Sequence, residues 1–122
     1  MVRPAEGEHI SHVGGRDHRV LLEIPELEVY ELRFTPDFEG VDPHTHAAHA
    51  DCFYVLEGRA EFLVGEEAVE AGAGTFVAAP PGAIHGFRVA GDGELRLLNI
   101  QAPNNGFGGR LRRHESGGAA RS

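Results

Sequence analysis

The sequence predicts an all-β protein, folded as a small antiparallel sandwich or barrel. Short runs of β-forming residues follow one another closely, and turns that contain glycine or proline separate them. The 17 glycines and 7 prolines also disfavour a helical bundle, because both residues are unfavourable inside helices. At 122 residues, the chain is long enough for one domain with a single hydrophobic core.

Eight or nine strands are expected from these runs. The first covers residues 18–24 and the second covers residues 27–34, and a proline follows each of them closely. In residues 59–64, apolar side chains occupy every second position, which predicts a strand with one buried face. The other strands are expected at residues 52–56, 68–70, 75–79, 84–89 and 94–100.

The two ends of the chain differ in composition from its middle. Residues 1–16 are polar and contain several glycines, which is typical of a flexible arm or of an edge strand. Residues 17–114 contain the strand-like runs and are expected to form the barrel domain. Residues 115–122 lack apolar anchors and are expected to be a disordered tail, while residues 103–113 are compatible with a short helical turn.

Charge and composition exclude several classes of protein. The formal net charge of −8 would repel phosphates, so nucleic-acid binding is not expected. No apolar run approaches the roughly 20 residues that cross a bilayer, and the N-terminus does not resemble a signal peptide. Cys52 is the only cysteine, so no internal disulfide is expected, and a cytoplasmic protein is expected. The absence of lysine excludes Schiff-base catalysis.

Histidine is the residue that stands out, with eight copies in 122 residues. In a strand, His44 and His46 would point to the same side, about 6–7 Å apart. Asp51 lies an odd number of residues from His44, so a turn or bulge within residues 47–50 must redirect it toward the same point. His85 belongs to a different strand, which follows a turn rich in proline and glycine.

These residue types suit a divalent transition metal. Neutral imidazoles and a carboxylate bind Fe, Mn, Ni, Cu or Zn. Three histidines and one aspartate would leave about two positions open in octahedral geometry, as a catalytic site requires. The alternative is an exposed loop of histidines that titrate and bind nothing.

Two short motifs with fixed spacing contain these four residues. The first consists of His44-Thr45-His46, four residues, Asp51, six residues and Gly58; the second consists of Gly74, five residues, Pro80-Pro81-Gly82, two residues and His85. In both motifs the sequence resembles the cupins, which are small β-barrels with a jelly-roll, or double-stranded β-helix, fold. The motifs lie within about residues 40–89, and the strand pattern extends the likeness to roughly residues 20–101.

The resemblance implies that the three motif histidines and Asp51 bind one metal ion. The family has Glu where this chain has Asp51, whose carboxylate reaches about 1.5 Å less far. Asp51 could bind the metal directly, bind it through water, or hold a ligating histidine. Two further departures are a shorter loop before the first motif, where Gly40 lies four residues before His44 rather than six, and Val89 in place of Asn, which we interpret as a packing position.

The resemblance also implies a small single-domain cupin that forms a homodimer and binds a small molecule. The favoured function is a metal-dependent enzyme such as a dioxygenase, because an Fe(II) ion with two open positions can bind oxygen beside a substrate. A redox-inert Zn would instead favour an isomerase, a lyase or a hydrolase. The alternatives are a cupin that binds a sugar or organic acid without turnover, and a regulatory domain, for which the sequence has no attached helix-turn-helix.

Three residues close to the first motif are further candidates. His49 could replace Asp51 as a ligand or act as a proton shuttle, or it could be a solvent-facing loop residue. Cys52 and Tyr54 have the opposite strand parity to Asp51, so both are expected to face away from the site. Cys52 therefore resembles a small buried hydrophobe more than a thiolate ligand or redox sensor, and Tyr54 is expected at an interface.

The remaining candidates belong to larger groups. One of three strand arginines could hold a substrate carboxylate, although such arginines more often pair with acidic side chains at the surface: Arg59, Arg88 and Arg96. Five apolar residues could line a pocket or fill the core: Phe62, Val64, Phe76, Phe87 and Leu97. Four histidines have no motif around them and receive no role: His9, His12, His18 and His114.

Overall fold

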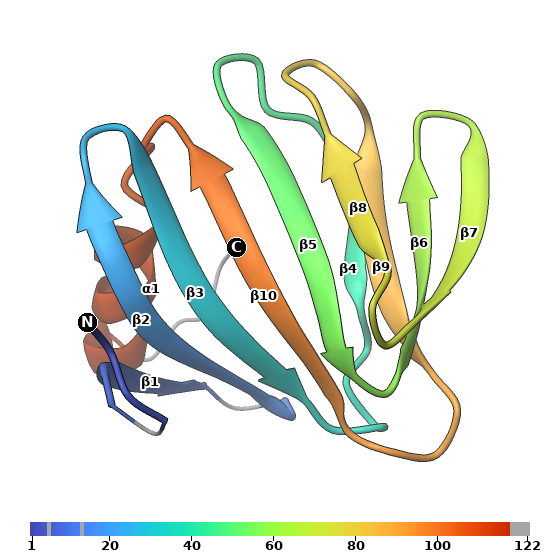
Figure 1. Cartoon of the computed structure of the whole chain (residues 1–122), viewed down its shortest axis with the longest axis horizontal. Coiled ribbons are helices and arrows are strands. Elements are labelled where there is room, and N and C mark those ends of the chain that lie inside the picture. Colours follow the sequence, from blue (N-terminus) through green and yellow to red (C-terminus); the bar gives the residue numbers. More distant parts are fainter. Residues whose placement is uncertain (5, 13, 118–122) are drawn as a thin grey trace.

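The computed structural model describes residues 1–4, 6–12 and 14–117, and its strands form two facing sheets (Figure 1). The larger sheet has six strands in the order β1-β2-β3-β10-β5-β8, and the smaller sheet has four in the order β4-β9-β6-β7. Paired strands are antiparallel throughout both sheets. The all-β prediction is therefore confirmed, and the two sheets form the flattened barrel of a jelly roll.

Short turns connect most of these strands. In the larger sheet they are β1 (Glu8–His12), β2 (Arg16–Ile24), β3 (Leu27–Phe34), β5 (Ala50–Glu57), β8 (Phe76–Ala79) and β10 (Leu95–Ala102). In the smaller sheet they are β4 (Val41–His44), β6 (Arg59–Val64), β7 (Glu67–Gly72) and β9 (His85–Ala90). One helix in the described part of the chain, α1 (Phe107–Gly117), follows β10.

The expected strands are all present, with ends close to the expected positions. The structure adds two strands to them. β1 is an edge strand, which is one of the two alternatives predicted for residues 1–16, and it pairs with β2. β4 has no strand pattern in the sequence, because it is short and contains Pro43. Its pairing with β9 defines it as a strand.

Alternation along the strands fills the space between the sheets with apolar side chains. Phe53 on β5 packs against Phe62 on β6 and Phe87 on β9, with ring centroids 5.2 and 5.6 Å from its own. Leu97 on β10 is fully buried beside them in the same core. Phe62, Phe87 and Leu97 are therefore core residues, and Val64 is only partly buried. Phe76 is 57% exposed on the outer face of the larger sheet, so its expected place in the core or a pocket wall is wrong.

Helix α1 covers part of the larger sheet that the smaller sheet does not reach. Figure 1 shows it beside β1 and β2, on the opposite side of the molecule from β6 and β7. Phe107 packs edge-on against the buried ring of Tyr30, with centroids 5.1 Å apart. Arg112 forms ion pairs with Glu8 on β1 and Glu23 on β2, which fasten the helix to the sheet edge.

Helix α1 extends into the C-terminal residues that are expected to form a tail. Its first part agrees with the helical turn expected near residues 103–113, but it continues to Gly117. Residues 115–117 are therefore helical where a tail is expected, and residues 118–122 lie outside the described part of the chain. None of the described segments forms a helix long and apolar enough to span a membrane.

Candidate metal centre

Four side chains from three strands and one loop meet between the sheets, where these strands begin or end. His44 ends β4 and His85 begins β9, and the two lie directly opposite each other in the register of the smaller sheet. Asp51 is the second residue of β5, and His46 lies in the loop between β4 and β5. One ligand atom from each of the four lies within 4.8 Å of the others. The structure thus brings together all four residues that the sequence assigns to the site.

The loop between β4 and β5 turns the chain back toward this point. β4 ends at His44, so the expectation that His46 shares its strand is wrong, although the two rings lie with centroids 4.6 Å apart. The backbone N–H of Gly82 donates a 2.7 Å hydrogen bond to the carbonyl of His46, which ties the loop to the turn before β9. Beyond the loop, Asp51 points inward and is 6% exposed, as the predicted redirection within residues 47–50 requires.

Hydrogen bonds to backbone carbonyls orient two of the imidazoles. Nδ1 of His44 lies 2.9 Å from the carbonyl oxygen of Asp42, and Nδ1 of His85 lies 3.0 Å from that of Ala83. A carbonyl oxygen can only accept a hydrogen bond, so both Nδ1 atoms carry a proton. This leaves Nε2 of each ring as the atom that can offer a lone pair to a metal.

Asp51 is the charged centre of the cluster. Its Oδ2 lies 3.0 Å from Nε2 of His85 and 3.8 Å from Nε2 of His46. Burial acts to lower the pKa of His85, but its hydrogen bonds to Asp51 and Ala83 outweigh burial, and the pKa is raised above its ordinary value. A second proton on Nε2 makes the His85 ring a cation that faces the carboxylate, and a metal ion would take the place of that proton.

His46 is shifted in the opposite direction. Burial, together with the neighbouring His49 and His44, lowers the pKa of His46 to about 4, so its ring is neutral at pH 7. The ring of His49 stacks on it, with centroids 4.2 Å apart. His49 is only 7% exposed, so its interpretation as a solvent-facing loop residue is wrong. Its Nε2 has no hydrogen-bond partner among the described residues, and burial lowers its pKa.

The spacing of the donor atoms fits a metal ion. Ligand atoms about 2.1 Å from a metal lie about 3.0 Å apart at right angles and about 4.2 Å apart across it. The two distances from Asp51 Oδ2, 3.0 and 3.8 Å, fall in this range, and the limit of 4.8 Å for the whole group exceeds it only slightly. Imidazole and carboxylate donors suit Fe, Mn, Ni, Cu and Zn. Geometry and donor set therefore agree with one divalent transition metal.

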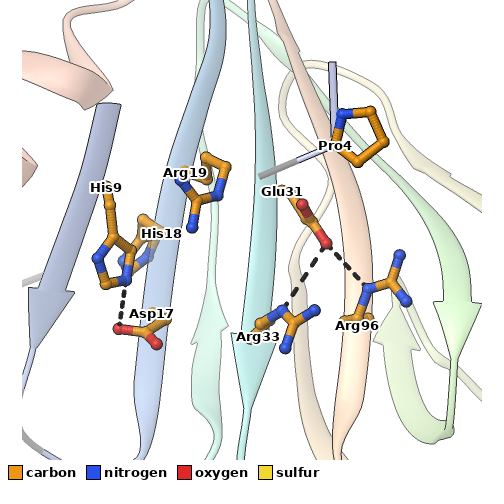
Figure 2. A pocket seen from close by; sticks show the side chains of 8 residues that line it. All are labelled: Pro4, His9, Asp17, His18, Arg19, Glu31, Arg33 and Arg96. Carbon is orange, nitrogen blue, oxygen red and sulfur yellow. Dashed lines mark hydrogen bonds and ion pairs between the residues drawn. The ribbon is translucent and has the colours of Figure 1, made fainter. Parts of the chain in front are cut away.

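The three strand arginines lie on the outer surface. Each forms an ion pair with glutamate: Arg59 with Glu70, Arg88 with Glu61, and Arg96 with both Glu31 and Glu57. Figure 2 shows Arg33 and Arg96 on either side of Glu31, in a depression of about 630 Å³ on the outer face of the larger sheet. No residue of the histidine cluster lines this depression. The surface-pairing interpretation of these arginines therefore agrees with the structure.

Cys52 and Tyr54 face away from the cluster, as their strand parity predicts. The burial pattern of β5 turns Asp51 and Phe53 inward and leaves Tyr54 39% exposed beside Phe76 on β8. Burial raises the pKa of the Cys52 thiol, which disfavours the thiolate that a metal ligand or redox sensor needs.

The histidines without a motif lie elsewhere. His9 on β1 forms an ion pair of 3.1 Å with Asp17, and His18 on β2 is buried against the ring of Phe107. The side chains of His12 and His114 lie outside the described part of the chain.

Sequence reasoning missed a row of buried polar residues on β10. Asn99 and Gln101 point inward and are 1% and 5% exposed. Nδ2 of Asn99 donates a 2.7 Å hydrogen bond to Oδ1 of Asp51. The sequence contains a pattern that predicts their burial. In a strand every second residue faces the same side, so Asn99 and Gln101 face inward if Leu95 and Leu97 do.

Solved structures with the same fold come from several bacteria. KdgF from Halomonas sp. has a TM-score of 0.77 and 21% identity over 86% of this chain and 94% of that one. An RmlC-like cupin from Shewanella frigidimarina has a TM-score of 0.75 and 22% identity over 86% and 91%. The polyketide cyclase RemF from Streptomyces resistomycificus has a TM-score of 0.72 and 22% identity over 85% and 79%. Identities this low establish the shared fold alone, and no protein with a curated description matches the sequence.

A match to a protein family covers the middle of the chain. The family model of the cupin domain matches residues 30–101, which extend from β3 into β10. That segment is more than half of the chain, and it contains both motifs and all four residues of the cluster. The chain belongs to the cupin family.

Proposed function

We propose that this cupin binds one divalent transition metal through His44, His46, Asp51 and His85, and that it is a metal-dependent enzyme acting on a small molecule. The observation that carries the proposal is the convergence of four donor atoms within 4.8 Å of one another. The metal is Fe, Mn, Ni, Zn or Cu, since each accepts imidazole and carboxylate ligands. The favoured reaction is a dioxygenation.

Each of the four residues has its own role in the proposed site. His44 and His85 offer Nε2 because their Nδ1 atoms donate to backbone carbonyls. His46 is neutral at pH 7, so it binds without first losing a proton. Asp51 supplies the negative charge, either as a ligand or as the acceptor that fixes the His85 ring.

The reaction depends on the metal and on the groups beside it. When bound, a redox-active ion such as Fe(II) would supply open positions for substrate and oxygen, and a redox-inert Zn would supply Lewis acidity for an isomerase. His49 is buried against His46 with an unpartnered Nε2, so it is available to hydrogen-bond a small molecule held there.

Elemental analysis tests the metal site directly. Protein purified without a histidine tag should contain about one Fe, Mn, Ni, Zn or Cu per chain, and His44→Ala should lose it. His9→Ala is the matched control, because His9 lies on the outer strand β1 and pairs with Asp17. If Asp51→Ala retains the metal, Asp51 is not a ligand but the acceptor that orients a ligating histidine, and the site has three protein ligands.

Assays of oxygen consumption and of isomerisation with candidate substrates then separate an enzyme from a binding protein. An enzyme turns the substrate over, whereas a cupin that only binds a sugar or organic acid shows nothing but a ligand-dependent rise in melting temperature. Less than about a tenth of a metal per chain after reconstitution would contradict the metalloenzyme proposal.

We also propose that the protein is a homodimer. The outer face of the larger sheet carries apolar side chains in register across its strands, with Leu98 on β10 beside Tyr54 on β5 and Tyr54 beside Phe76 on β8. Arg96 and Glu31 lie on the same face, so it carries charges of both signs. A two-fold interface brings a surface against itself, which a face of this mixed charge allows.

A further inference from the structure

A chain of hydrogen bonds connects helix α1 to the carboxylate of the metal centre. Arg110 donates from Nη2 to Oδ1 of Asn105 at 2.8 Å, and Nδ2 of Asn105 donates to Oε1 of Gln101 at 2.7 Å. Nε2 of Gln101 donates to Oδ1 of Asn99 at 2.9 Å. Nδ2 of Asn99 donates to Oδ1 of Asp51 at 2.7 Å. Each side-chain amide thus accepts from the residue before it and donates toward Asp51.

The direction of this chain is fixed at both ends. A guanidinium can only donate, so Arg110 requires the oxygen of Asn105 to face it, and this sets the orientation of each amide in turn. At the other end, Nδ2 of Asn99 also donates to the backbone carbonyl of Cys52 at 3.0 Å, and that oxygen can only accept. Asn99 therefore presents its NH2 group, not its oxygen, to Asp51.

Burial makes this orientation costly to change. Asn99 is 1% exposed and Gln101 is 5% exposed, at positions where the preceding inward residues of β10 are fully buried leucines. A buried amide that loses a partner has given up its hydrogen bonds to water without replacement, so a reversed amide in the chain is unfavourable.

The far end of the chain is anchored in the fold. The backbone N–H of Asn105 donates at 2.7 Å to Glu28, a carboxylate with no exposed surface. Glu28 also accepts from the backbone N–H of Gly108 at the start of α1 and from the hydroxyl of Tyr30. The position of Asn105, and with it the first amide of the chain, is therefore set by the docking of the helix.

As a consequence, the two carboxylate oxygens of Asp51 face different groups. Oδ1 accepts from Asn99, and Oδ2 faces Nε2 of His85 at 3.0 Å and Nε2 of His46 at 3.8 Å. Rotation of the carboxylate would break the bond to Asn99, so Oδ2 is held toward the histidines. The fixed orientation of the carboxylate compensates for the aspartate side chain, which is one methylene shorter than glutamate.

We propose that Asn99 is a positioning residue for the metal centre, and that the chain from Arg110 through Asn105 and Gln101 holds its amide in the orientation that fixes Asp51. This inference rests on the proposed metal site. Asn99 acts through Asp51, because its NH2 group donates to that carboxylate and to the backbone carbonyl of Cys52.

Cobalt affinity measures this role without any assay of activity. We would titrate Co²⁺ into the metal-free full chain in competition with a chelating indicator, and record the melting temperature of each metal-free variant. Asn99→Leu keeps the volume of the side chain and removes its donor, so the dissociation constant should rise about 10–100-fold. Asn104→Ala is the matched control: Asn104 is an amide beside the chain whose side chain bonds to the backbone of Ile24 and Gly106 instead, and the affinity should change less than about twofold.

A double variant separates positioning from a general loss of structure. If Asn99 acts through Asp51, Asn99→Leu should have no further effect on cobalt affinity in the Asp51→Ala background. Arg110→Met, at the partly exposed end of the chain, should lower the affinity by a smaller factor of about three, because the amides keep their contacts but lose their fixed direction. Arg110→Met also carries the test if Asn99→Leu does not fold.

Three results would overturn the inference, and they differ in what else they contradict. If the unmodified protein binds no Co²⁺, the proposed metal site fails as well. If that protein binds Co²⁺ and Asn99→Leu or a folded Arg110→Met binds it equally well, only the positioning role fails. If Asn99→Leu weakens binding by the same factor with and without Asp51, its effect is one of general stability.

Discussion

At the scale of single residues, the metal centre depends on which nitrogen of each histidine carries the proton. The carbonyls of Asp42 and Ala83 hold the protons of His44 and His85 on Nδ1. The second nitrogen of His85 faces Asp51, and there a proton and a metal ion compete for the same place. The order in which His85 and His46 titrate is therefore a direct test of the arrangement.

In the metal-free protein, His85 should hold its second proton above the ordinary value of 6.5, and His46 should stay neutral until the pH approaches about 4. The hydrogen bond to Asp51 favours charged His85, whereas burial beside two other histidines disfavours charged His46. Imidazole resonances in a two-dimensional NMR titration, assigned with single histidine variants, would report both values. Protonation of His46 near pH 6.5 would contradict the buried environment described for it.

The pKa shifts of His46 and His85 make the free energy of unfolding depend on pH in opposite directions. Between pH 6.5 and about 4, the unfolded chain binds a proton at His46 that the folded protein excludes, so stability at this residue falls as the pH falls. His85 has a raised pKa, so its contribution is complete below 6.5 and is lost as the pH rises through the folded value.

Residue types and their spacing are enough to identify part of this site. The set of His44, His46, Asp51 and His85 follows from the two motifs and from their resemblance to the cupins, and the donor atoms of all four do converge. The burial of His49 and the bond from Asn99 to Asp51 do not follow, because they depend on the path of one loop and on which strands become neighbours. Asn99 and Asp51 are separated by 48 positions in the chain, and only the pairing of β5 with β10 brings them together.

At the scale of elements, the site requires β4 and β9 to lie unusually close. Gly86 follows His85 on β9, and a Cβ atom there would lie 2.6 Å from the carbonyl oxygen of Val41 and 3.0 Å from the nitrogen of Pro43. Only glycine allows this approach of the two backbones. The approach also sets His44 opposite His85.

Gly86→Ala should therefore push β4 away from β9. We expect a loss of roughly 1–3 kcal/mol in the free energy of unfolding, as for other overpacked sites, together with weaker metal binding because His44 moves with β4. Urea unfolding and cobalt titration would measure the two effects. Gly93→Ala is the matched control, because a Cβ atom at Gly93 would meet no atom within 4 Å. Equal stability of the two variants would contradict the close approach.

The elements themselves differ in how well the sequence predicts them. β3 and β6 begin and end at the expected residues, because turn residues bound them and their apolar residues alternate. β4 could not be predicted, since a short segment with a proline has no strand pattern of its own and exists through its pairing with β9. The start of α1 is rich in glycine, so the sequence predicts only a short helical turn in this region. The packing of Phe107 on Tyr30 stabilises the longer helix that the structure has.

At the scale of the whole molecule, the two faces of the larger sheet have different surroundings. The inner face is covered by the smaller sheet and by α1, and its apolar residues are buried. On the outer face, Phe76 and Tyr54 are 57% and 39% exposed, and Leu22 on β2 is 40% exposed opposite Val29 on β3. Ile100 on β10 lies between Val29 and Cys52, so the apolar residues continue from one side of the sheet to the other. An apolar row of this kind, together with exposed aromatic side chains, is typical of a surface that another protein covers.

If a second copy of the chain covers that face, one charge placed on it should separate the dimer. Phe76→Glu adds a carboxylate at the most exposed of these aromatic side chains, where it alters no buried contact of the core. In a two-fold interface each substitution acts twice, so the effect on association is doubled. Light scattering after size exclusion should give twice the chain mass for the unmodified protein and the single chain mass for Phe76→Glu. Ala68→Glu on β7, an exposed position in the other sheet, should remain a dimer. A monomer in all three samples would contradict the homodimer but leave the metal centre unaffected, because all four of its residues come from one chain.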